Sequence, residues 1–380
     1  MMTKENLLNW CEEHAAEQIE LLKVLAAIPA PSHHEEKRAE FIQAWLHRCG
    51  AEDAYIDEAK NVVLPMGCDG RDDIHVYMAH TDVVFPDMTP LPVREENGRL
   101  YAPGVGDDTA NVSALMMCVK YLLSTGMVPE EPVLLVFNSC EEGLGNLKGV
   151  RQIMSGYQGR IAELVSFDGQ YTALVTRAVG SERWLVEVST IGGHSYGAFG
   201  NPNAIAYLAR LVGKLYEQEV PVVAHRKTTY NVGTIAGGTS VNTIAQNAQM
   251  TYEYRSDDLE SLQTMRSQFR KLVEEADCEE AQFKLTLLGE RPCGSYVPAD
   301  RHQKLLDRCA QAIEEVTGTT PSYRSSSTDA NIPLSLGIPA TTFGLYLGAK
   351  AHTREEHIEI GSLLPGLKIG LKLVSAHFRK

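Results

Sequence analysis

Residues 131–140, "EPVLLVFNSC", constrain the fold more than any other segment because they contain an unbroken apolar run. A strand with one face in water alternates apolar and polar residues, whereas an unbroken run is typical of a strand that is covered on both faces. Two further short strands are predicted in the first half of the chain, at 73–80 and 164–169. Helical periodicity predicts helices around these strands, over 4–28, 33–50 and 107–126. This alternation of helix and strand favours an α/β domain with a mostly parallel sheet and helices on both of its faces.

The pattern changes near residue 181. Residues 181–192 alternate apolar and polar side chains, as a half-buried antiparallel strand does. The segments that follow are predicted as strands and amphipathic helices, with strands at 228–238, 247–256 and 281–289 and helices at 203–218 and 261–276. Beyond about residue 292 a helix over 300–318 and a strand-like segment over 339–347 are predicted. We therefore expect an α/β domain of residues 1–180 plus 291–380, interrupted by a smaller α+β domain of residues 181–290.

The composition excludes several classes of protein. The chain has 49 acidic and 35 basic residues, a net charge of −14 and no cluster of Lys and Arg, which argues against nucleic-acid binding. It has no run of 18 apolar residues, and its N-terminus lacks the basic and then apolar order of a secretory signal. Its eight cysteines are scattered without a CxxC pair, which fits a reducing compartment. We expect a cytoplasmic protein that binds neither nucleic acid nor a membrane.

Acidic and histidine side chains follow several predicted strands at the point where each strand ends. The adjacent pair Glu141 and Glu142 comes after the central apolar run. Taken alone, such a pair is explained by a solvated turn or a helix start. Comparable groups follow other predicted strands, namely His80, Asp82, Asp168 and His352. Because ligand sites in open α/β sheets lie outside the carboxyl ends of the strands, we expect these side chains to face one site.

Asp107 and Asp108 add two carboxylates at a predicted helix start. Each group has an ordinary explanation, since an Asp there is usually a cap and a strand-end His is usually a loop residue. The glycines in "GVG" lack the spacing of a dinucleotide-binding fingerprint. Together, however, histidines and carboxylates without cysteine suit Zn²⁺, and also Mn²⁺ or Co²⁺. Two ions that share one carboxylate would use the whole set, and one glutamate of the pair could then stay off the metal as a general base.

The motifs resemble those of one enzyme family over nearly the whole chain. The stretches that carry the resemblance are, in order, "HTD", "GVGDD", "CEEG", "SFDG", "GGHSYGAFGNPNAI", "SVNTIAQNAQMTYEYRS", "SSTDA" and "AHTREEH". They are similar to motifs of the co-catalytic zinc metallopeptidases, a family that includes peptidase T, carboxypeptidase G, acetylornithine deacetylase, succinyl-diaminopimelate desuccinylase and the aminoacylases. The fold implied is the mostly parallel α/β sheet of a zinc exopeptidase with an inserted lid or dimerisation domain.

The resemblance implies a role for each residue of the predicted metal site. One ion would be held by His80, Asp107 and Asp168, and the other by Asp107, Glu142 and His352. Asp82 would orient His80, and Glu141 would be the general base for a hydroxide that bridges the ions. The resemblance also implies a cis peptide bond between Asp107 and Asp108.

Four further residues match the family's substrate-binding positions more loosely. His194, in the inserted domain, would reach the active site of a partner subunit in a homodimer, and Asn242 would act in the same region. Arg255 would bind a carboxylate of the substrate, and Thr328 would help to position it. Ordinary explanations stay open, because Arg255 could form a surface ion pair and His194 could be a loop residue.

The chain departs from the family's usual pattern in two places. Many members have Lys two residues after the bridging Asp, where this chain has Thr109, and many have glycines where it has Ser325, Ser326 and Ser327. Both positions bear on the shape of the substrate pocket. The resemblance implies hydrolysis of an amide bond in a small di- or tripeptide with a free carboxylate, as in aminopeptidases and tripeptidases. An N-acyl-amino-acid deacylase or desuccinylase is the main alternative, and a metal-binding homologue without activity or a nucleotide-binding protein are the others.

Overall fold

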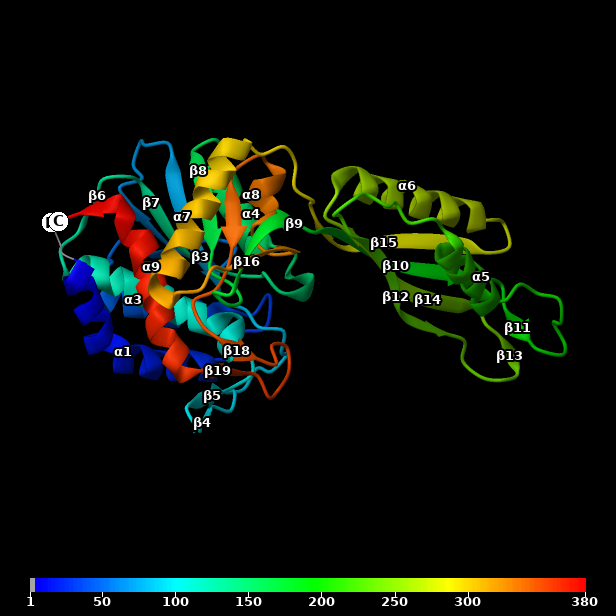
Figure 1. Cartoon of the computed structure of the whole chain (residues 1–380). Helices are drawn as coiled ribbons and strands as arrows, with labels where there is room; N and C mark the ends of the chain where they lie inside the picture. Colours follow the sequence, from blue (N-terminus) through cyan, green and yellow to red (C-terminus); the bar gives the residue numbers. More distant parts are fainter. Residues whose placement is uncertain (1–3) are drawn as a thin grey trace. The chain divides into compact units, whose positions relative to one another are not determined.

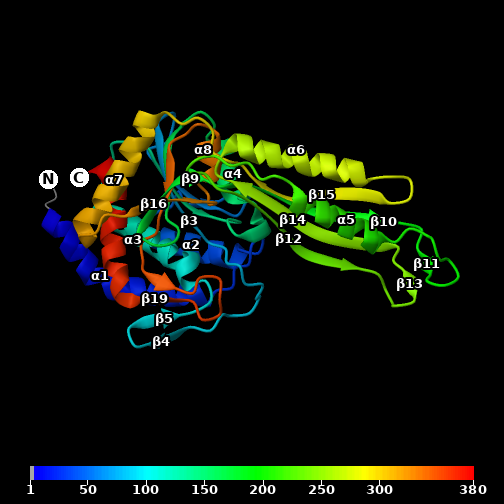
Figure 2. The ribbon, with the colours of Figure 1, turned by 45° about the vertical axis from the view of Figure 1, so that its right-hand side comes forward.

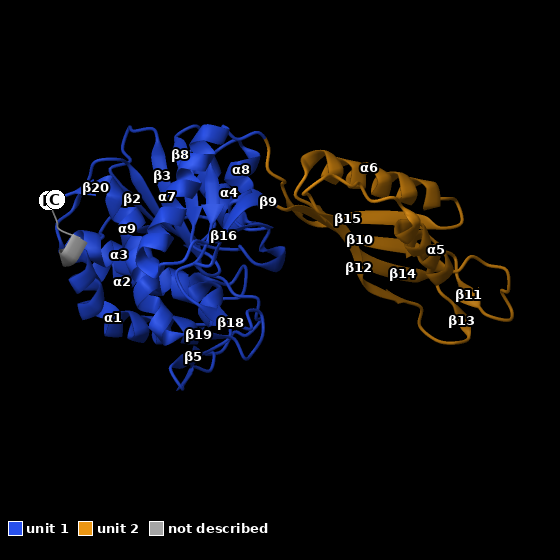
Figure 3. Cartoon of the chain, viewed as in Figure 1, with its two compact units in different colours: residues 1–178, 296–380 blue, residues 179–295 orange. Residues whose placement is uncertain are grey.

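The computed structural model describes residues 4–380, which form two compact units. Unit 1 consists of the chain up to Ala178 together with Tyr296–Lys380, and unit 2 consists of Val179–Ser295 (Figure 3). The predicted insert began at 181 and ended at 290, so unit 2 is longer by two residues at its start and by five at its end. None of the helices in residues 4–380 has the length and apolar character needed to cross a membrane.

Unit 1 is built on an eight-stranded sheet of mixed direction (Figure 1). From one edge to the other, its strands are β1 (Tyr55–Ile56), β2 (Val62–Met66), β7 (Val133–Asn138), β3 (Ile74–His80), β8 (Ile161–Ser166), β17 (Ala340–Thr342), β9 (Ala173–Ala178) and β16 (Ser322–Ser326). The central strands β7, β3, β8 and β17 are parallel to one another, whereas β1 and β2 are antiparallel. The predicted fold class, α/β with a mostly parallel sheet, is confirmed.

Helices cover both faces of this sheet. One face packs against α1 (Lys4–Ala27), α2 (Glu36–Arg48), α3 (Asn111–Ser124), α7 (Ala299–Thr317) and α9 (Leu363–Val374). The other face packs against α4 (Lys148–Gly156) and the short α8 (Asn331–Ser335). Within β7, Leu135 and Phe137 belong to the first core while Leu134 and Val136 belong to the second. Burial on both faces is therefore why the sequence of β7 is an unbroken apolar run.

The predicted strand over 339–347 is correct only for β17 (Ala340–Thr342). Beyond Phe343 the chain leaves the sheet and passes against Gly169, where a Cβ on Gly344 would lie 1.4 Å from the Gly169 carbonyl oxygen. The chain then joins a separate sheet that was not predicted, made of β4 (Arg94–Glu96), β5 (Arg99–Tyr101), β18 (Gly348–Ala349) and β19 (His357–Glu359). A further pair of short strands, β6 (Val128–Pro129) and β20 (Phe378–Arg379), lies near the C-terminus.

Unit 2 is a four-stranded antiparallel sheet with helices on one face (Figure 2). Its strands are, in spatial order, β12 (Thr228–Gly237), β14 (Asn247–Ser256), β10 (Gly180–Ser189) and β15 (Gln282–Arg291). Helices α5 (Ala204–Glu217) and α6 (Leu259–Ala276) pack on β10 and β14 through a core that includes Trp184, Val186 and Val188. The alternate residues of β10 face away from this core, so the opposite face of the sheet is open. A two-stranded sheet of β11 (Gly193–His194) and β13 (Thr243–Ile244) follows the ends of β10 and β12.

Candidate metal centre

The parallel strands of unit 1 bring three predicted groups to one edge of the sheet. Strands β7, β3 and β8 are neighbours, and His80 is the last residue of β3. Glu141 and Glu142 come three and four residues after the end of β7, and Asp168 comes two residues after the end of β8. Because parallel strands end at the same edge, the sheet itself places these side chains together.

The two other metal-site residues lie on loops rather than at ends of this sheet. Asp107 belongs to a turn of Val105–Ala110 that precedes α3, and its φ of −93° and ψ of 92° are not helical. The peptide bond from Asp107 to Asp108 is cis, as predicted. His352 was expected directly after a strand of the main sheet, but it follows β18 of the small sheet and has a φ of 65°. That expectation was wrong because the chain leaves the main sheet before reaching His352.

The side chains of the site converge on Asp107. His80 Nε2 lies 3.0 Å from Asp107 Oδ1, and His352 Nε2 lies 3.1 Å from Asp107 Oδ2. His352 Nε2 is also 3.0 Å from Glu142 Oε1. Each oxygen of Asp107 thus faces a different histidine, as a carboxylate shared by two ions would require.

Two overlapping groups of possible metal ligands result from this arrangement. Each residue of a group offers a donor atom within 4.8 Å of the others, and the groups are His80, Asp107, Asp108 and Asp168, and Asp107, Glu142 and His352. The structure therefore brings together all five predicted ligands, with Asp107 in both groups.

The electrostatics of the cluster favour cations. Hydrogen bonds to Asp107 and Glu142 raise the pKa of His352 to about 11, and the pKa of His80 is also raised because Asp108 and Asp107 outweigh its burial. Burial, opposed by His352 and reinforced by Asp107, raises the pKa of Glu142 to about 7. The carboxylates thus hold protons on both imidazoles. Positive ions in place of these protons would satisfy the same charges, so the residues fit divalent metal ions.

Buried carboxylates hold the backbone around the ligands. Asp82 accepts hydrogen bonds from the backbone N–H groups of Glu141 (2.9 Å) and Glu142 (3.0 Å), and its Oδ1 lies 3.4 Å from His80 Nδ1. Asp108 Oδ2 accepts a hydrogen bond from the His80 N–H at 2.9 Å. Asp82 therefore fixes both the imidazole that ends β3 and the loop that follows β7, which is how outer groups orient metal ligands.

Glu141 lies beside the ligands and is almost completely buried, with 5% of its surface exposed. One of its carboxylate oxygens is within 4.8 Å of donor atoms of His80 and Glu142. Its backbone is held by Asp82, and the preceding residue, Cys140, adopts a left-handed φ of 58°. This bend turns the chain out of the strand direction just before the glutamate pair.

Unit 2 brings His194 and Asn242 together on its two-stranded sheet. The backbone N–H of Ser195 donates to the carbonyl oxygen of Asn242 at 2.9 Å, and both His194 and Asn242 are exposed. His194 Nδ1 accepts hydrogen bonds from the N–H groups of Tyr196 (3.3 Å) and Gly197 (3.2 Å). A neutral imidazole held in this way carries its proton on Nε2, so His194 presents a hydrogen-bond donor.

Arg255 lies at the other end of unit 2 from His194. It is paired with Ser181 of β10, whereas β14 begins at Asn247, close to β11 and β13. The eight residue steps from Asn247 to Arg255 span about 27 Å of extended strand. The guanidinium of Arg255 donates to both oxygens of Glu253, at 3.1 and 3.0 Å. Arg255 therefore has an ion-pair partner in this structure.

Thr328 is buried in unit 1, and its hydroxyl is engaged within the protein. Its Oγ1 lies 2.8 Å from Thr342 Oγ1 and accepts a hydrogen bond from the Ala330 N–H at 3.3 Å. The side chain thus stabilises the loop between β16 and α8.

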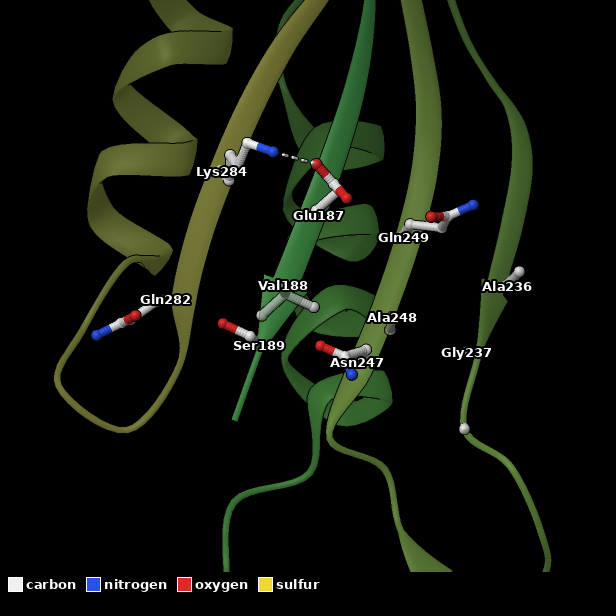
Figure 4. Close-up of a pocket in the computed structure, with 11 residues that line it drawn as sticks. Glu187, Val188, Ser189, Ala236, Gly237, Asn247, Ala248, Gln249, Gln282 and Lys284 are labelled. Atoms are coloured by element: carbon white, nitrogen blue, oxygen red, sulfur yellow. Dashed lines mark hydrogen bonds and ion pairs between the residues drawn. The ribbon is translucent and has the colours of Figure 1, made fainter. Parts of the chain in front are cut away.

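The open face of the unit 2 sheet carries a shallow pocket of about 420 Å³ (Figure 4). Glu187 and Lys284 form an ion pair of 3.1 Å along its wall, and Asn247 and Gln249 point into the same region. Its lining includes none of the predicted site residues. The pocket is lined by no histidine and by a single carboxylate, Glu187, so its chemistry does not resemble that of the metal cluster.

Several residues that support the site were missed at the sequence level. Asn111 donates to Asp108 Oδ1 and accepts from the Leu345 N–H, and Asp329 accepts a 2.8 Å hydrogen bond from Asn138. Arg38 is fully buried and donates to the Thr81 carbonyl oxygen at 2.8 Å and to Thr109 Oγ1 at 3.3 Å. The signal for Arg38 was hidden in "HHEEKRAE", which reads as the charged surface of a helix.

A second histidine and carboxylate group lies at the amino ends of the same strands. It consists of His75 at the start of β3, Glu163 at the start of β8, and His377 near the C-terminus, with donor atoms within 4.8 Å of one another. Glu131, just before β7, also contacts both histidines. No prediction was made for this group.

The chain resembles known proteins over most of its length. Peptidase family M20/M25/M40 matches residues 76–376. The chain is 27% identical over 351 residues to a Mycobacterium tuberculosis protein provisionally named succinyl-diaminopimelate desuccinylase DapE, and the match covers 91% of this chain and 94% of that protein.

Solved structures share the fold. The aminopeptidase PepT of Bacillus cereus has a TM-score of 0.74 and 18% sequence identity, and the match covers 96% of this chain and 98% of that one. The Bacillus subtilis protein YXEP, described as a dinuclear metal-binding peptidase, has a TM-score of 0.63 and 13% identity over 96% of this chain and 99% of that one.

Proposed function

Since the chain belongs to peptidase family M20/M25/M40, it is a hydrolase of amide bonds, and we propose that its substrate is a di- or tripeptide with a free carboxylate. We propose an exopeptidase of the aminopeptidase or tripeptidase kind. The observation that carries the proposal is the pair of overlapping ligand groups that share Asp107 and adjoin the buried Glu141.

We propose two divalent ions per chain, with zinc preferred to manganese or cobalt because each group combines imidazole with carboxylates. His80, Asp107 and Asp168 would hold one ion, and Asp107, Glu142 and His352 would hold the other. When bound, such ions lower the pKa of a water molecule and polarise the carbonyl group of the substrate. The raised pKa values of both histidines support this role. They show that the surrounding carboxylates attract positive charge, here in the form of protons on the imidazoles.

Glu141 is the proposed general base and acid. Its carboxylate accepts a proton from the attacking water while the water oxygen bonds to the carbonyl carbon. The same proton then passes to the departing nitrogen as the C–N bond breaks, which balances the hydrolysis and returns Glu141 to its charged state. Asp82 keeps Glu141 in place by binding its backbone N–H.

His194 and Arg255 have proposed roles that require two chains. A tripeptide spans only about 10 Å, so unit 2 of one chain cannot present both ends of β14 to a single substrate. We therefore assign His194, with Asn242 beside it, to the active site of a partner in a homodimer, where His194 Nε2–H would donate to the oxyanion. The exposed side chains of Tyr196, Phe199 and Val241 around His194 are suited to burial against a partner.

Arg255 is the proposed ligand for the carboxylate of the substrate, and Thr328 the proposed support of the substrate-binding loop. Because Glu253 already binds the Nε and Nη2 edge of the Arg255 guanidinium, the substrate would have to displace this glutamate or share the guanidinium with it. The eight free cysteines are the reason for also proposing a reducing location such as the cytoplasm.

The second candidate is an N-acyl-amino-acid deacylase or desuccinylase with the same site. The observation that favours it is the 27% identity to a protein named as a desuccinylase, which exceeds the 18% identity to the aminopeptidase PepT. The chemistry at Glu141 would be unchanged, and only the group on the carbonyl side of the cleaved bond would differ.

The proposal is tested by metal analysis of the purified protein together with a substrate panel of free dipeptides, tripeptides, N-acetyl and N-succinyl amino acids. We expect about two zinc ions per chain and cleavage of peptides that disappears on chelation and returns with zinc. Cleavage of only the acyl compounds would move the deacylase to first place. No metal uptake and no hydrolysis of any compound would overturn the proposal.

A further inference from the structure

Glu356 is a buried carboxylate close in sequence to the predicted metal ligand His352. It lies four residues after His352, at the end of the loop that leads into β19, and it is 2% exposed. Nothing in the sequence distinguishes it from its exposed neighbour Glu355 in "AHTREEH". A buried carboxylate needs partners, so its contacts reveal what it does.

The carboxylate of Glu356 binds the backbone of the loop that carries Asp107. Its Oε2 accepts the N–H of Gly104 at 3.0 Å. Its Oε1 accepts the N–H groups of Gly106 at 2.9 Å and of Asp107 at 2.8 Å. Three short bonds from N–H groups to one charged acceptor form a strong clamp in a buried place.

The backbone of Glu356 also binds the segment that leads into the loop of Asp107. The Ala102 N–H donates to the Glu356 carbonyl oxygen at 3.3 Å, and the next residue, His357, pairs with Tyr101 in the small sheet. On the other side of the loop, a Cβ on Gly106 would lie 2.6 Å from the Tyr346 hydroxyl. The loop is thus held between Tyr346 and Glu356, with little freedom to move.

This clamp joins the two metal-site residues that the main sheet does not place. His80 and Asp168 lie at or just beyond strand ends, whereas Asp107 and His352 lie on separate loops. Glu356 belongs to the loop of His352 and binds the loop of Asp107. A change at Glu356 would therefore leave the strand-end ligands in place and loosen the other two.

We propose that Glu356 is a positioning residue that sets the distance between Asp107 and His352. It would control the ion proposed for Asp107, Glu142 and His352, which has two ligands on these loops, more than the ion proposed for His80, Asp107 and Asp168, which has one. This inference rests on the proposed function, because it assumes the two ions. It assigns no contact between Glu356 and a metal or substrate. Groups that orient ligands in this way typically change metal affinity by about 10- to 100-fold when they are altered.

The test is a zinc titration of chelator-treated protein by calorimetry, comparing the natural chain with Glu356→Gln. Glutamine keeps the shape but turns an N–H₂ group toward N–H donors and loses the charge. We expect two ions in the natural chain, and in the variant one ion weakened at least tenfold and the other, which depends on only one of the two loop ligands, weakened less. Circular dichroism and the melting temperature of the metal-free proteins report separately on folding.

Two further variants keep the test decisive. Glu355→Gln removes the same charge one residue away, where the side chain is exposed and only 3.5 Å from Arg94, and it should bind both ions as the natural chain does. Glu356→Asp keeps the carboxylate on a shorter side chain and should recover part of the zinc affinity of the weakened site. It replaces Glu356→Gln in the titration if that variant does not fold.

The outcomes separate this inference from the proposed function. If the natural chain binds two ions and Glu356→Gln behaves like Glu355→Gln, the positioning role is wrong while the enzyme assignment stands. If both ions weaken equally in Glu356→Gln, the selective control of one ion is wrong. If the natural chain binds no ion, both proposals fall.

Discussion

The two ends of the central sheet in unit 1 carry similar residues in different arrangements. At the carboxyl ends of β3, β7 and β8 lie His80, the glutamate pair and Asp168, joined by Asp107 and His352. At the amino ends lie His75, Glu131, Glu163 and His377. Each end therefore has two histidines and several carboxylates within a few ångströms.

The donor atoms lie close together at both ends, and the difference is which partners they already have. At the amino end, His75 Nδ1 is 2.8 Å from Glu163 Oε1, and His377 lies 2.9 Å from the Tyr77 hydroxyl through Nε2 and 2.5 Å from Glu131 through Nδ1. Glu163 is also paired with Arg308. The rings of His75 and His377 are stacked, with centroids 4.1 Å apart and an angle of 29° between them, and Glu131 Oε2 also lies 3.5 Å from His75 Nε2.

At the carboxyl end the Nε2 atoms of both histidines point at the two oxygens of one carboxylate, Asp107. At this end, protons on the imidazoles occupy positions where metal ions would fit. At the amino end, the guanidinium of Arg308 already binds Glu163, and the hydroxyl of Tyr77 already contacts His377. The comparison teaches that residue types and proximity alone do not define a metal site, because it also matters whether other side chains already occupy the donor atoms.

The largest expected effect comes from removing the shared carboxylate. Asp107→Ala should lose both ions and reduce kcat/KM by about 10³-fold or more, since Asp107 belongs to both ligand groups. Metal content and peptide hydrolysis measure this. A variant that kept two ions would contradict this account, because metal binding at the carboxyl end would then not depend on Asp107.

Glu141→Gln should separate metal binding from chemistry. Both ions should remain, because Glu141 is outside the proposed ligand set, while kcat should fall by about 10²- to 10⁴-fold with a small change in KM. Steady-state kinetics and metal analysis on one preparation give the answer. Near-normal kcat would remove Glu141 from the role of general base.

His377→Ala probes the opposite end of the sheet. It should lower the free energy of unfolding by about 1–3 kcal/mol, because the buried Tyr77 hydroxyl loses His377 and keeps only its hydrogen bond to the Leu373 carbonyl oxygen. Metal content, kcat and KM should match those of the natural chain. Loss of an ion in this variant would mean that the amino end also binds metal, and the distinction drawn between the two ends would fail.

The smallest effect is a difference in pH dependence between the ends in metal-free protein. Burial and the charge of Glu141 raise the pKa of Asp329, next to Asn138 at the end of β7, to about 7. The stability that it contributes is present below its ordinary pKa near 4 and is lost as the pH rises through about 7. Burial also acts to raise the pKa of Glu163, but His75 and Arg308 outweigh burial and lower that pKa. The stability that Glu163 contributes is therefore lost as the pH falls.

Melting temperatures at pH 5 and pH 8 for Asp329→Asn, and at about pH 3.5 and pH 8 for Glu163→Gln, test these opposite signs, because the contribution of Glu163 is lost only below its ordinary pKa. Relative to the natural chain, Asp329→Asn should be more stable at pH 8 than at pH 5. Glu163→Gln should instead lose stability at pH 8 and lose less of it in acid. The same sign in both variants would contradict the difference in charge balance between the two ends.

The sequence predicted that His80, Asp168 and the glutamate pair gather at one edge because they follow elements with strong signals. The apolar run of β7 and the short strand β3 locate Glu141 and His80, and parallel pairing then requires them to meet. Motif resemblance assigned ligand roles to Asp107 and His352, which lie on loops that the main sheet does not place. The same resemblance carried His194, Asn242 and Arg255, whose roles remain predictions.

Other features gave no usable signal. Arg38 and Glu356 are buried, although their segments have the charged composition of solvent-exposed helices and loops. Their burial could not be predicted because it depends on partners far away in the chain. The strand expected over 339–347 ended early because of a close approach between Gly344 and Gly169, a contact between segments remote in sequence. The amino-end cluster was missed because Glu131, Glu163 and His377 have no common motif.

The most direct test of the distinction between the two ends is anomalous X-ray diffraction from crystals grown with zinc, recorded on both sides of the zinc absorption edge. We predict two anomalous peaks per chain, both beside Asp107, one toward His80 and Asp168 and one toward Glu142 and His352, and none beside His75 and His377. A peak between the stacked histidines, or the absence of peaks at Asp107, would contradict the account.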